Sequence, residues 1–249
     1  MMDAQLNLCK SLAWFLPKDS ELPLSVPCPE PRSAKDLIES CGIPHPELES
    51  ILVNDHPATM ETLVQAGDRI EAFGPFSPVD VTIPGSLQRK PMEEPRFVAD
   101  VHLGTLVRYL RLLGFDCKYW PFRDDDQLAA TSEADNRIML TRDRGLLKRG
   151  NINFGCYVRS DQPEQQMEDL LHHFALLPFI KPYSRCLSCS GVLQRVEPEV
   201  VADELPPATL ATIEVANRCV DCGKLFWRGS HSSRLDALVQ RFTQGLMAD

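Results

Sequence analysis

The sequence lacks the short motifs that mark several large classes of enzyme. It contains no GxSxG, no phosphate-binding loop ending in GKS or GKT, no GxGxxG and no HExxH. These absences argue against a nucleophile-elbow hydrolase, a P-loop nucleotide hydrolase, a dinucleotide-dependent enzyme and a zinc protease, because each class builds its site on one of these motifs. Any reaction must therefore use another arrangement of residues.

Long apolar segments are also missing. No run approaches the roughly 18 apolar residues that a membrane-spanning helix needs. The first residues, MMDAQLNLCKSLAWF, have no long apolar core behind a basic start, so they do not resemble a signal peptide. Nine cysteines without a secretion signal favour a reducing compartment, in which thiols are free or bound to metal. We therefore expect a cytoplasmic protein with no membrane partner.

Positive charge is scarce in the first third of the chain. Residues 1–85 hold 5 Lys and Arg against 13 Asp and Glu, whereas residues 86–249 hold 21 against 22. This acidity argues mildly against nucleic-acid binding, although the nearly neutral C-terminal part can still present a basic patch. Residues 137–149 contain five basic residues and one aspartate. A solvated surface is the simpler interpretation of that run.

The N-terminal part predicts a small domain followed by a linker. Residues 1–76 predict an α+β domain of strands with one helix over SAKDLIESCG, for which Ser33 is the expected N-cap and Gly42 the stop. The segment ESILVNDHP predicts a strand that ends in an Asn-Asp turn. Residues 77–95 contain four prolines and predict an extended, semi-rigid linker.

The C-terminal part predicts an α/β domain and a cysteine-rich module. Residues 96–178 alternate short strands with helices, which implies a parallel sheet with helices on both faces. The expected strands are RFVAD, FDCKYW, NRIMLTRD and CYVRS. Residues 179–249 contain two CxxC pairs and a closing amphipathic helix, HSSRLDALVQRF.

The two CxxC pairs predict a structural zinc site. Cys186 and Cys189 are separated from Cys219 and Cys222 by 29 residues. Each pair can direct two sulfurs to one point, and four thiolates form the closed tetrahedral set that Zn²⁺ prefers. Two disulfides or a thioredoxin-like redox site are the alternatives, but the first needs an oxidising compartment and the second needs one pair at a helix start.

Every predicted strand of residues 96–178 leads to an aspartate. Carboxyl ends of parallel strands share one edge, where carboxylates repel one another unless a cation neutralises them. Mg²⁺ or Mn²⁺ would suit oxygen ligands and could activate water for attack on a phosphodiester. Taken singly, each aspartate has a turn or a helix cap as its simpler role. The candidate catalytic residues at these strand ends are Asp100, Asp124, Asp125, Asp126, Asp143 and Asp161.

Four arginines are candidates for contact with a nucleic-acid backbone. Arg142 and Arg144 flank Asp143, and Arg108 and Arg111 lie on the predicted helix after the first strand. Guanidinium groups near a carboxylate cluster can position the phosphates of a substrate.

Several segments, in order, resemble the Mut-seven C-terminal ribonuclease domain. They are FVADVHLGTLVRYLRLLGFD, DDDQL, RIMLTRDRGLLKR and CGKLFWRGSH, within about residues 96–242. The resemblance implies a PIN-like nuclease core with an appended zinc ribbon. It also implies that Asp100, one or both of Asp125 and Asp126, and Asp143 bind metal, that Asp161 matches less securely, and that the four paired cysteines bind zinc.

The first 76 residues look like the ubiquitin-like β-grasp domain that is often fused before that nuclease. The segments AKDLIESCGIPHPELESILVND and GDRIEAFGPF carry this resemblance. Related sulfur carriers end in a free Gly-Gly, whereas here the chain continues through Phe73-Gly74-Pro75-Phe76. Sulfur transfer is therefore disfavoured, and a docking role toward a protein partner or an RNA-positioning role is left open.

The sequence thus predicts a divalent-metal-dependent ribonuclease that hydrolyses RNA, with structural Zn²⁺ and catalytic Mg²⁺ or Mn²⁺. The alternative is a non-catalytic adaptor that binds RNA or the ribosome through a PIN-like core.

Overall fold

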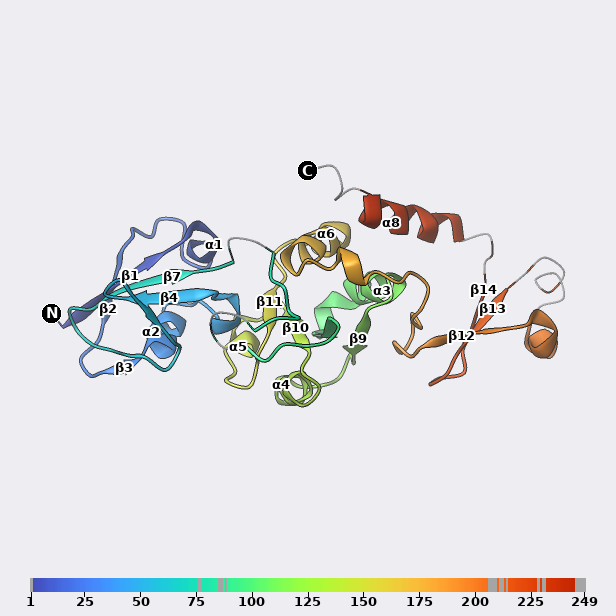
Figure 1. The fold of residues 1–249 in the computed structure, drawn as a ribbon, viewed down its shortest axis with the longest axis horizontal. Coiled ribbons are helices and arrows are strands. Elements are labelled where there is room, and N and C mark those ends of the chain that lie inside the picture. Colours follow the sequence, from blue (N-terminus) through green and yellow to red (C-terminus); the bar gives the residue numbers. More distant parts are fainter. Residues whose placement is uncertain are drawn as a thin grey trace. The chain divides into compact units, whose positions relative to one another are not determined.

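The structure, a computed structural model, describes residues 2–75, 78–84, 87, 89–205, 210, 213, 215–227, 229 and 232–244. The chain folds into two compact units. Unit 1 consists of Met1–Glu94 and Phe122–Arg159, and unit 2 consists of Pro95–Pro121 and Ser160–Asp249. Figure 1 traces the course of the chain through the helices and strands.

A mixed five-stranded sheet forms the N-terminal part of unit 1, drawn in blue to cyan in Figure 1. Its order is β2-β1-β7-β4-β5. The strands are β1 (Asp3–Leu8), β2 (Leu24–Pro27), β4 (Ser50–Val53), β5 (His56–Ala58) and β7 (Arg69–Phe73). β1 and β7 are parallel, and the other neighbours are antiparallel. Two short strands, β3 (Arg32–Ser33) and β6 (Leu63–Val64), form a separate antiparallel pair.

Local sequence signals explain the helix and the turn of this domain. Helix α2 (Ala34–Ser40) begins after Ser33, whose hydroxyl accepts a hydrogen bond from the Asp36 amide at 3.0 Å. Gly42, with φ of 95°, follows the helix end. Asn54 and Asp55 both have positive φ and join β4 to β5, which confirms the predicted turn.

Six described elements of this domain were not predicted. They are the short strands β2, β3, β5 and β6, the short helix α1 (Lys10–Ala13) and the 3₁₀ turn η1 (His45–Glu47). β2 lies in a proline-rich stretch and ends at Pro27, and α1 and η1 have only one turn each. Segments this short carry no hydrophobic period that a sequence pattern could reveal.

Four short strands of residues 96–178 form one parallel pair in each unit. These strands are β8 (Arg96–Ala99), β9 (Asp116–Tyr119), β10 (Ile138–Thr141) and β11 (Gly155–Tyr157). β8 pairs with β9 and β10 pairs with β11, both in parallel. All four residues of β10 are buried, as is typical of a strand covered on both faces. The α/β class with parallel pairing is therefore confirmed.

Helices accompany the strands within each unit. In unit 2, α3 (Gly104–Leu112) packs against β9 and against α6 (Pro163–His173). In unit 1, α4 (Asp125–Ala134) packs on β10, and α5 (Arg144–Leu147) packs on β10 and β11. Two 3₁₀ turns, η2 (Val101–Leu103) and η3 (Leu177–Phe179), complete this region.

The expected linker contains residues that are packed in unit 1. Val81 and Met92 are buried, and the Met92 amide donates to the Val81 carbonyl at 2.9 Å. Arg89 is only 7% exposed and donates hydrogen bonds to the carbonyls of Pro46 and Leu48. The described part of this segment is therefore not a free tether.

The cysteine module, residues 179–229, forms an antiparallel sheet of order β12-β13-β14. Its elements are β12 (Leu193–Val196), the 3₁₀ segment η4 (Pro198–Glu204), β13 (Ala216–Cys219) and β14 (Leu225–Trp227). The closing helix α8 (Ser232–Gln244) buries Phe242 with its ring 5.5 Å from that of Tyr109 on α3. Arg241 of α8 also pairs with Glu168 of α6 at 2.8 Å.

A search of the described helices for a membrane-spanning segment finds none of sufficient length and apolarity.

Gly114 should be essential where the chain leaves α3. It has φ of 94°, and an added Cβ would lie 2.1 Å from the Lys181 carbonyl oxygen. Gly67 has a similar φ of 91°, but a Cβ added to Gly67 would have no neighbouring atom within 4 Å. We expect Gly67→Ala to lower the free energy of unfolding by about 1 kcal/mol and Gly114→Ala by about 3 kcal/mol, because only the second adds a clash to the backbone strain. Chemical unfolding of both variants tests this, and equal losses would contradict the close approach.

Candidate functional site

Four cysteine sulfurs gather in the cysteine module. The Sγ atoms of Cys186, Cys189, Cys219 and Cys222 all lie within 4.8 Å of one another. Cys186 and Cys222 are 3.7 Å apart and Cys189 and Cys219 are 3.4 Å apart, and none of these cysteines is in a disulfide. Four sulfurs at a Zn–S distance of about 2.3 Å would be about 3.8 Å apart in a tetrahedron. The donor set therefore fits zinc in both chemistry and spacing.

Backbone amides donate hydrogen bonds to the sulfurs. The amides of Ser188 and Gly191 donate to the sulfurs of Cys186 and Cys189, each at 3.4 Å. The thiol pKa values differ within the cluster. Burial raises the pKa of Cys189 to about 12. Although burial of Cys219 also opposes ionisation, hydrogen bonds from the amides of Cys222 and Asp221 lower the pKa of its thiol to about 7. Thiolates are the form that binds a metal, so metal binding displaces the protons of the remaining thiols.

Arg111 was predicted to contact the substrate, but in the structure it is buried and binds backbone carbonyls. Its side chain is buried, with 4% of the residue exposed. Nε and Nη2 donate to the Cys117 carbonyl at 3.1 and 2.8 Å, and Nη1 donates to the carbonyls of Leu187 and Ser188 at 3.1 and 2.9 Å. The guanidinium thus joins strand β9 to the first knuckle (Cys186–Gly191). A buried group with these partners has no surface on which a phosphate could bind, so we withdraw the substrate role.

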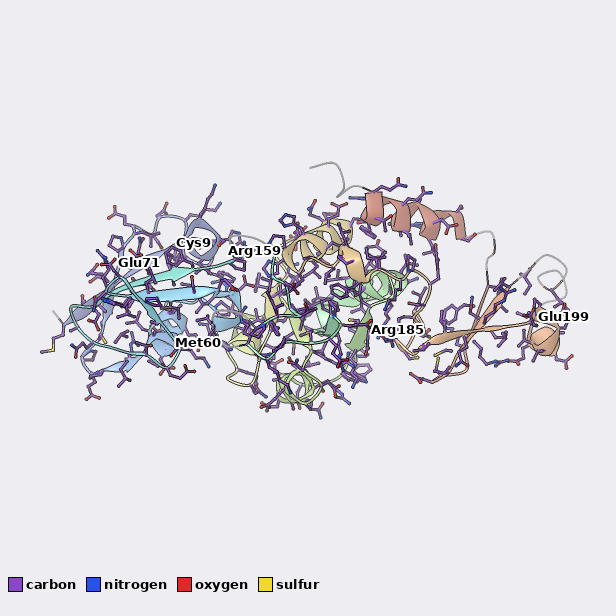
Figure 2. The ribbon with its side chains drawn as sticks, in the orientation of Figure 1. Cys9, Met60, Glu71, Arg159, Arg185 and Glu199 are labelled. Atoms are coloured by element: carbon purple, nitrogen blue, oxygen red, sulfur yellow. The ribbon has the colours of Figure 1, made fainter. Side chains whose placement is uncertain are left out.

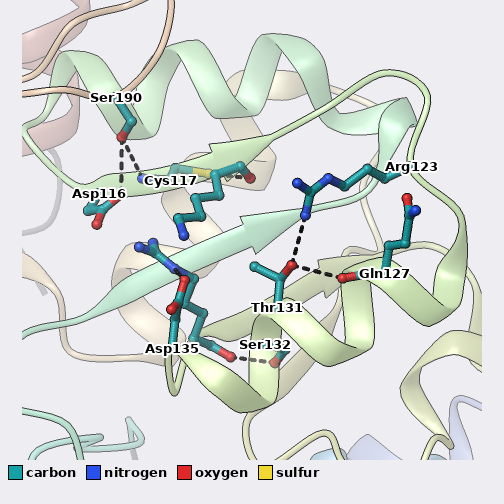
Figure 3. Close-up of polar contacts among 10 residues, drawn as sticks. Asp116, Cys117, Arg123, Gln127, Thr131, Ser132, Asp135 and Ser190 are labelled. Carbon is teal, nitrogen blue, oxygen red and sulfur yellow. Dashed lines mark hydrogen bonds and ion pairs between the residues drawn. The ribbon is translucent and has the colours of Figure 1, made fainter. Parts of the chain in front are cut away.

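The first knuckle also binds the edge of β9 through Ser190. Figure 3 shows the Ser190 hydroxyl against Asp116 and Cys117. Its oxygen accepts from the Cys117 amide at 2.8 Å and donates to Asp116 Oδ1 at 3.3 Å. The Cys117 amide therefore has its partner in the knuckle, and the Cys117 carbonyl has its partner in Arg111, which also contacts the knuckle. β9 is an end strand of its sheet, and such strands are stabilised when another segment takes up their hydrogen bonds.

In unit 2, the predicted acidic residues occupy two different settings. Asp100 directly follows β8, is half-buried, and accepts a hydrogen bond from the Val101 amide at 2.6 Å. Asp161 is exposed and precedes α6. The expected strand CYVRS ends at Tyr157, so Asp161 follows four residues later and is not at the strand end itself.

In unit 1, the predicted acidic residues lie at the starts of α4 and α5. Asp143 is the N-cap of α5, and its Oδ1 accepts from the amides of Gly145 and Leu146 at 2.6 and 3.4 Å. Asp125 and Asp126 are the first residues of α4, after Asp124 as the N-cap. Asp126 is exposed and forms an ion pair with Arg149. Helix capping, the simpler role considered for strand-end aspartates, therefore applies to Asp124 and Asp143.

The metal site at the acidic residues remains a prediction. Within the described ranges, a group of three or more metal-ligating side chains near one point occurs at the four cysteines, and the aspartates form no such group. Oxygen donors that follow buried strands fit Mg²⁺ or Mn²⁺ in their chemistry.

The remaining predicted arginines differ in exposure. Arg108 on α3 and Arg142 between β10 and α5 are exposed. Arg144 instead donates from Nη1 to the Phe15 carbonyl at 2.7 Å, with its Cζ 5.1 Å from the centroid of the Phe15 ring. Sequence reasoning missed this contact because 129 residues separate the two partners and neither belongs to a recognisable motif.

Comparison with known families covers both parts of the chain. Residues 95–239 match the family described as the Mut7-C RNAse domain, and residues 1–80 match the Mut7-C ubiquitin family. The chain belongs to the Mut7-C RNAse domain family. The order of the two matches confirms the expected arrangement, in which a ubiquitin-like domain precedes a ribonuclease-like Mut7-C domain. Searches of curated proteins and of solved structures found no match.

We expect the purified Mut7-C protein to contain about one zinc ion per chain, because four thiols surround one point. Cys186→Ser should lose the zinc and destabilise the cysteine module, since structural zinc contributes directly to folding. Cys41→Ser is the matched control, because Cys41 is a partly buried thiol of the ubiquitin-like domain and is not in the cluster. Metal analysis with thiol titration measures both, and a wild-type chain without zinc, or a control that loses it, would contradict the site.

Proposed function

We propose that this protein is a divalent-metal-dependent ribonuclease that hydrolyses phosphodiester bonds of RNA. The observation that carries the proposal is the position of two carboxylates in the matched ribonuclease-like domain. Asp100 follows β8 without a gap, and Asp143 follows β10 after one residue. Parallel strands carry their functional residues at the carboxyl ends, which is where both aspartates lie.

Asp100 and Asp143 are the proposed ligands of Mg²⁺ or Mn²⁺. Such an ion, when bound, supplies an activated water and neutralises charge on the attacked phosphodiester. Asp125 or Asp126, at the start of α4, completes the ligand set or orients the water. Asp161, which lies before α6, is the least secure of the proposed acidic residues.

The other parts have supporting roles in this proposal. Arg108 and Arg142, both exposed, contact the phosphates of the RNA. Zinc at the four cysteines holds the ribbon together and takes no part in hydrolysis, since a closed four-thiolate site has no open position. The proposed domain limits stay at residues 1–76 for the ubiquitin-like part, 96–178 for a PIN-like core and 179–249 for the zinc ribbon and its helix.

A non-catalytic RNA-binding adaptor is the second candidate. The ion pair between Asp126 and Arg149 and the capping of α5 by Asp143 favour it, because they give two of the predicted acidic residues a structural partner. Such a protein would bind RNA without turnover and without a need for metal.

Replacement of Asp100 or Asp143 by Asn distinguishes the two candidates. Asn also caps helices well, so Asp143→Asn should preserve α5 while removing the charge that a metal needs. We expect each variant to cleave labelled RNA at least about 100-fold more slowly than wild type with Mg²⁺ or Mn²⁺, the order of loss seen when one group that stabilises a transition state is removed.

Asp169→Asn is the matched control, because Asp169 is an exposed residue of α6 that accepts a hydrogen bond from Gln165. It should keep full activity. Cleavage that is unchanged in the Asp100→Asn and Asp143→Asn variants would contradict the mechanism, and metal-independent RNA binding without product would favour the adaptor.

A further inference from the structure

Arg144 connects the segment that carries Asp143 to the ubiquitin-like domain, both within unit 1. It is the first residue of α5 and the direct neighbour of Asp143. Its Nη1 donates to the Phe15 carbonyl at 2.7 Å, and its Cζ lies 5.1 Å from the ring centroid of Phe15 and 5.8 Å from that of Trp14. A hydrogen bond from a charged donor is stronger than one between neutral groups, and the two rings add a cation–π contact to it.

The far end of α5 is fastened to the same domain. Lys148, the C-cap residue of α5, donates from Nζ to the Glu39 carbonyl at 2.6 Å. Glu39 belongs to α2 of the ubiquitin-like domain. The four-residue helix therefore has a cationic contact with this domain at each end. A helix of one turn has little stability of its own, so these contacts largely determine its position.

The strand β11, on which α5 packs, is bound to the same domain by a buried carboxylate. Glu47 is 5% exposed, and its Oε1 accepts from the Tyr157 amide at 2.7 Å. Its Oε2 lies 3.3 Å from Arg159, which is labelled in Figure 2. Burial raises the pKa of Glu47, while the Tyr157 amide and Arg159 act in the opposite direction. A buried carboxylate is costly without partners, so its two partners fix how the domain meets β11.

A histidine adds a further buried contact between these parts. The Nε2 atom of His45 lies 2.9 Å from the Ile152 carbonyl, and Nδ1 lies 2.7 Å from Glu39 Oε1. The turn η1, which contains Pro46, also packs against β11, and a side chain added at Gly155 would come within 3.2 Å of Pro46 Cβ. The ubiquitin-like domain therefore meets residues 144–157 through a specific, buried surface.

We propose that Arg144 is a positioning residue for the ribonuclease reaction, through which the ubiquitin-like domain holds α5 and the carboxylate of Asp143 in place. The inference deepens the proposed function and rests on it for the role of Asp143. It also replaces the earlier expectation for Arg144, because the contacts with Phe15 and Trp14 occupy the guanidinium that was assigned to phosphate. The ubiquitin-like domain then contributes to the geometry of the nuclease site, in addition to any docking role.

The two roles of Arg144 predict different kinetics. A residue that positions a catalytic carboxylate affects kcat, whereas a residue that only binds the substrate phosphate affects KM. In the full-length, zinc-loaded protein we expect Arg144→Ala to lower kcat about tenfold and to change KM by less than about twofold, since small displacements of a catalytic group are costly. Arg144→Lys should be intermediate, because Lys can donate to the Phe15 carbonyl but lacks the planar group that stacks on the rings.

Amide hydrogen exchange provides a second readout that does not depend on activity. The amides of Gly145 and Leu146 bond to Asp143 Oδ1 and report directly on the cap of α5. We expect them to exchange at least about fivefold faster in Arg144→Ala, with β1 and β7 unchanged, because loss of this contact opens the helix locally. Arg69→Ala is the matched control: Arg69 is an exposed arginine of β7 that pairs with Asp55, and its loss should affect neither readout.

Two outcomes would overturn the inference, and a third would separate it from the proposed function. Unchanged exchange at Gly145 and Leu146 in both Arg144 variants would overturn it. A tenfold rise in KM with normal kcat would also overturn it and restore the phosphate contact. If the wild-type protein fails to cleave RNA, the proposed function fails, and faster exchange in the variants would still support the structural link between the domain and α5.

Discussion

Guanidinium groups that donate to backbone carbonyls hold together segments that lie far apart in this sequence. Arg111 joins β9 to the first cysteine knuckle, Arg89 joins the expected linker to η1, and Arg144 joins α5 to the segment after α1. Arginine is suited to this task because it has five N–H donors in a rigid plane and no acceptor. Buried carbonyls need partners, so each of these arginines satisfies a requirement of the fold.

This arrangement makes the accessory parts structural partners of the ribonuclease-like domain. In unit 2, the first knuckle covers the edge of β9 and depends on the same four sulfurs that suit zinc. In unit 1, the ubiquitin-like domain fastens both ends of the short helix that Asp143 caps. The combination of these parts in one chain thereby supports short strands and one-turn helices, which would be weakly ordered alone.

The sequence revealed the features that depend on neighbouring residues. Ser33 and Asp36 are three residues apart, the Asn54–Asp55 turn is local, and each CxxC pair spans one turn, so all three were predictable. The parallel pairing followed from the alternation of strands with helices. The positions of Arg111 and Arg144 were not predictable, because the Leu187 and Phe15 carbonyls, which accept from them, lie 76 and 129 residues away. A solvent-exposed arginine has the same local sequence pattern. The strand end at Tyr157 was misplaced by three residues, because the apolar Val158 followed by the polar Arg159 still has the alternation of a strand.

The central claim is that strand-end aspartates bind the divalent ion that hydrolysis needs. Anomalous diffraction from crystals of the zinc-loaded, full-length protein soaked in Mn²⁺ tests it most directly, because it locates manganese separately from zinc. We predict a manganese peak at about 2.2 Å from carboxylate oxygens of Asp100 and Asp143, in an octahedral set of oxygen ligands. Crystals in which zinc occupies the four cysteines while no manganese binds at either aspartate would contradict the account.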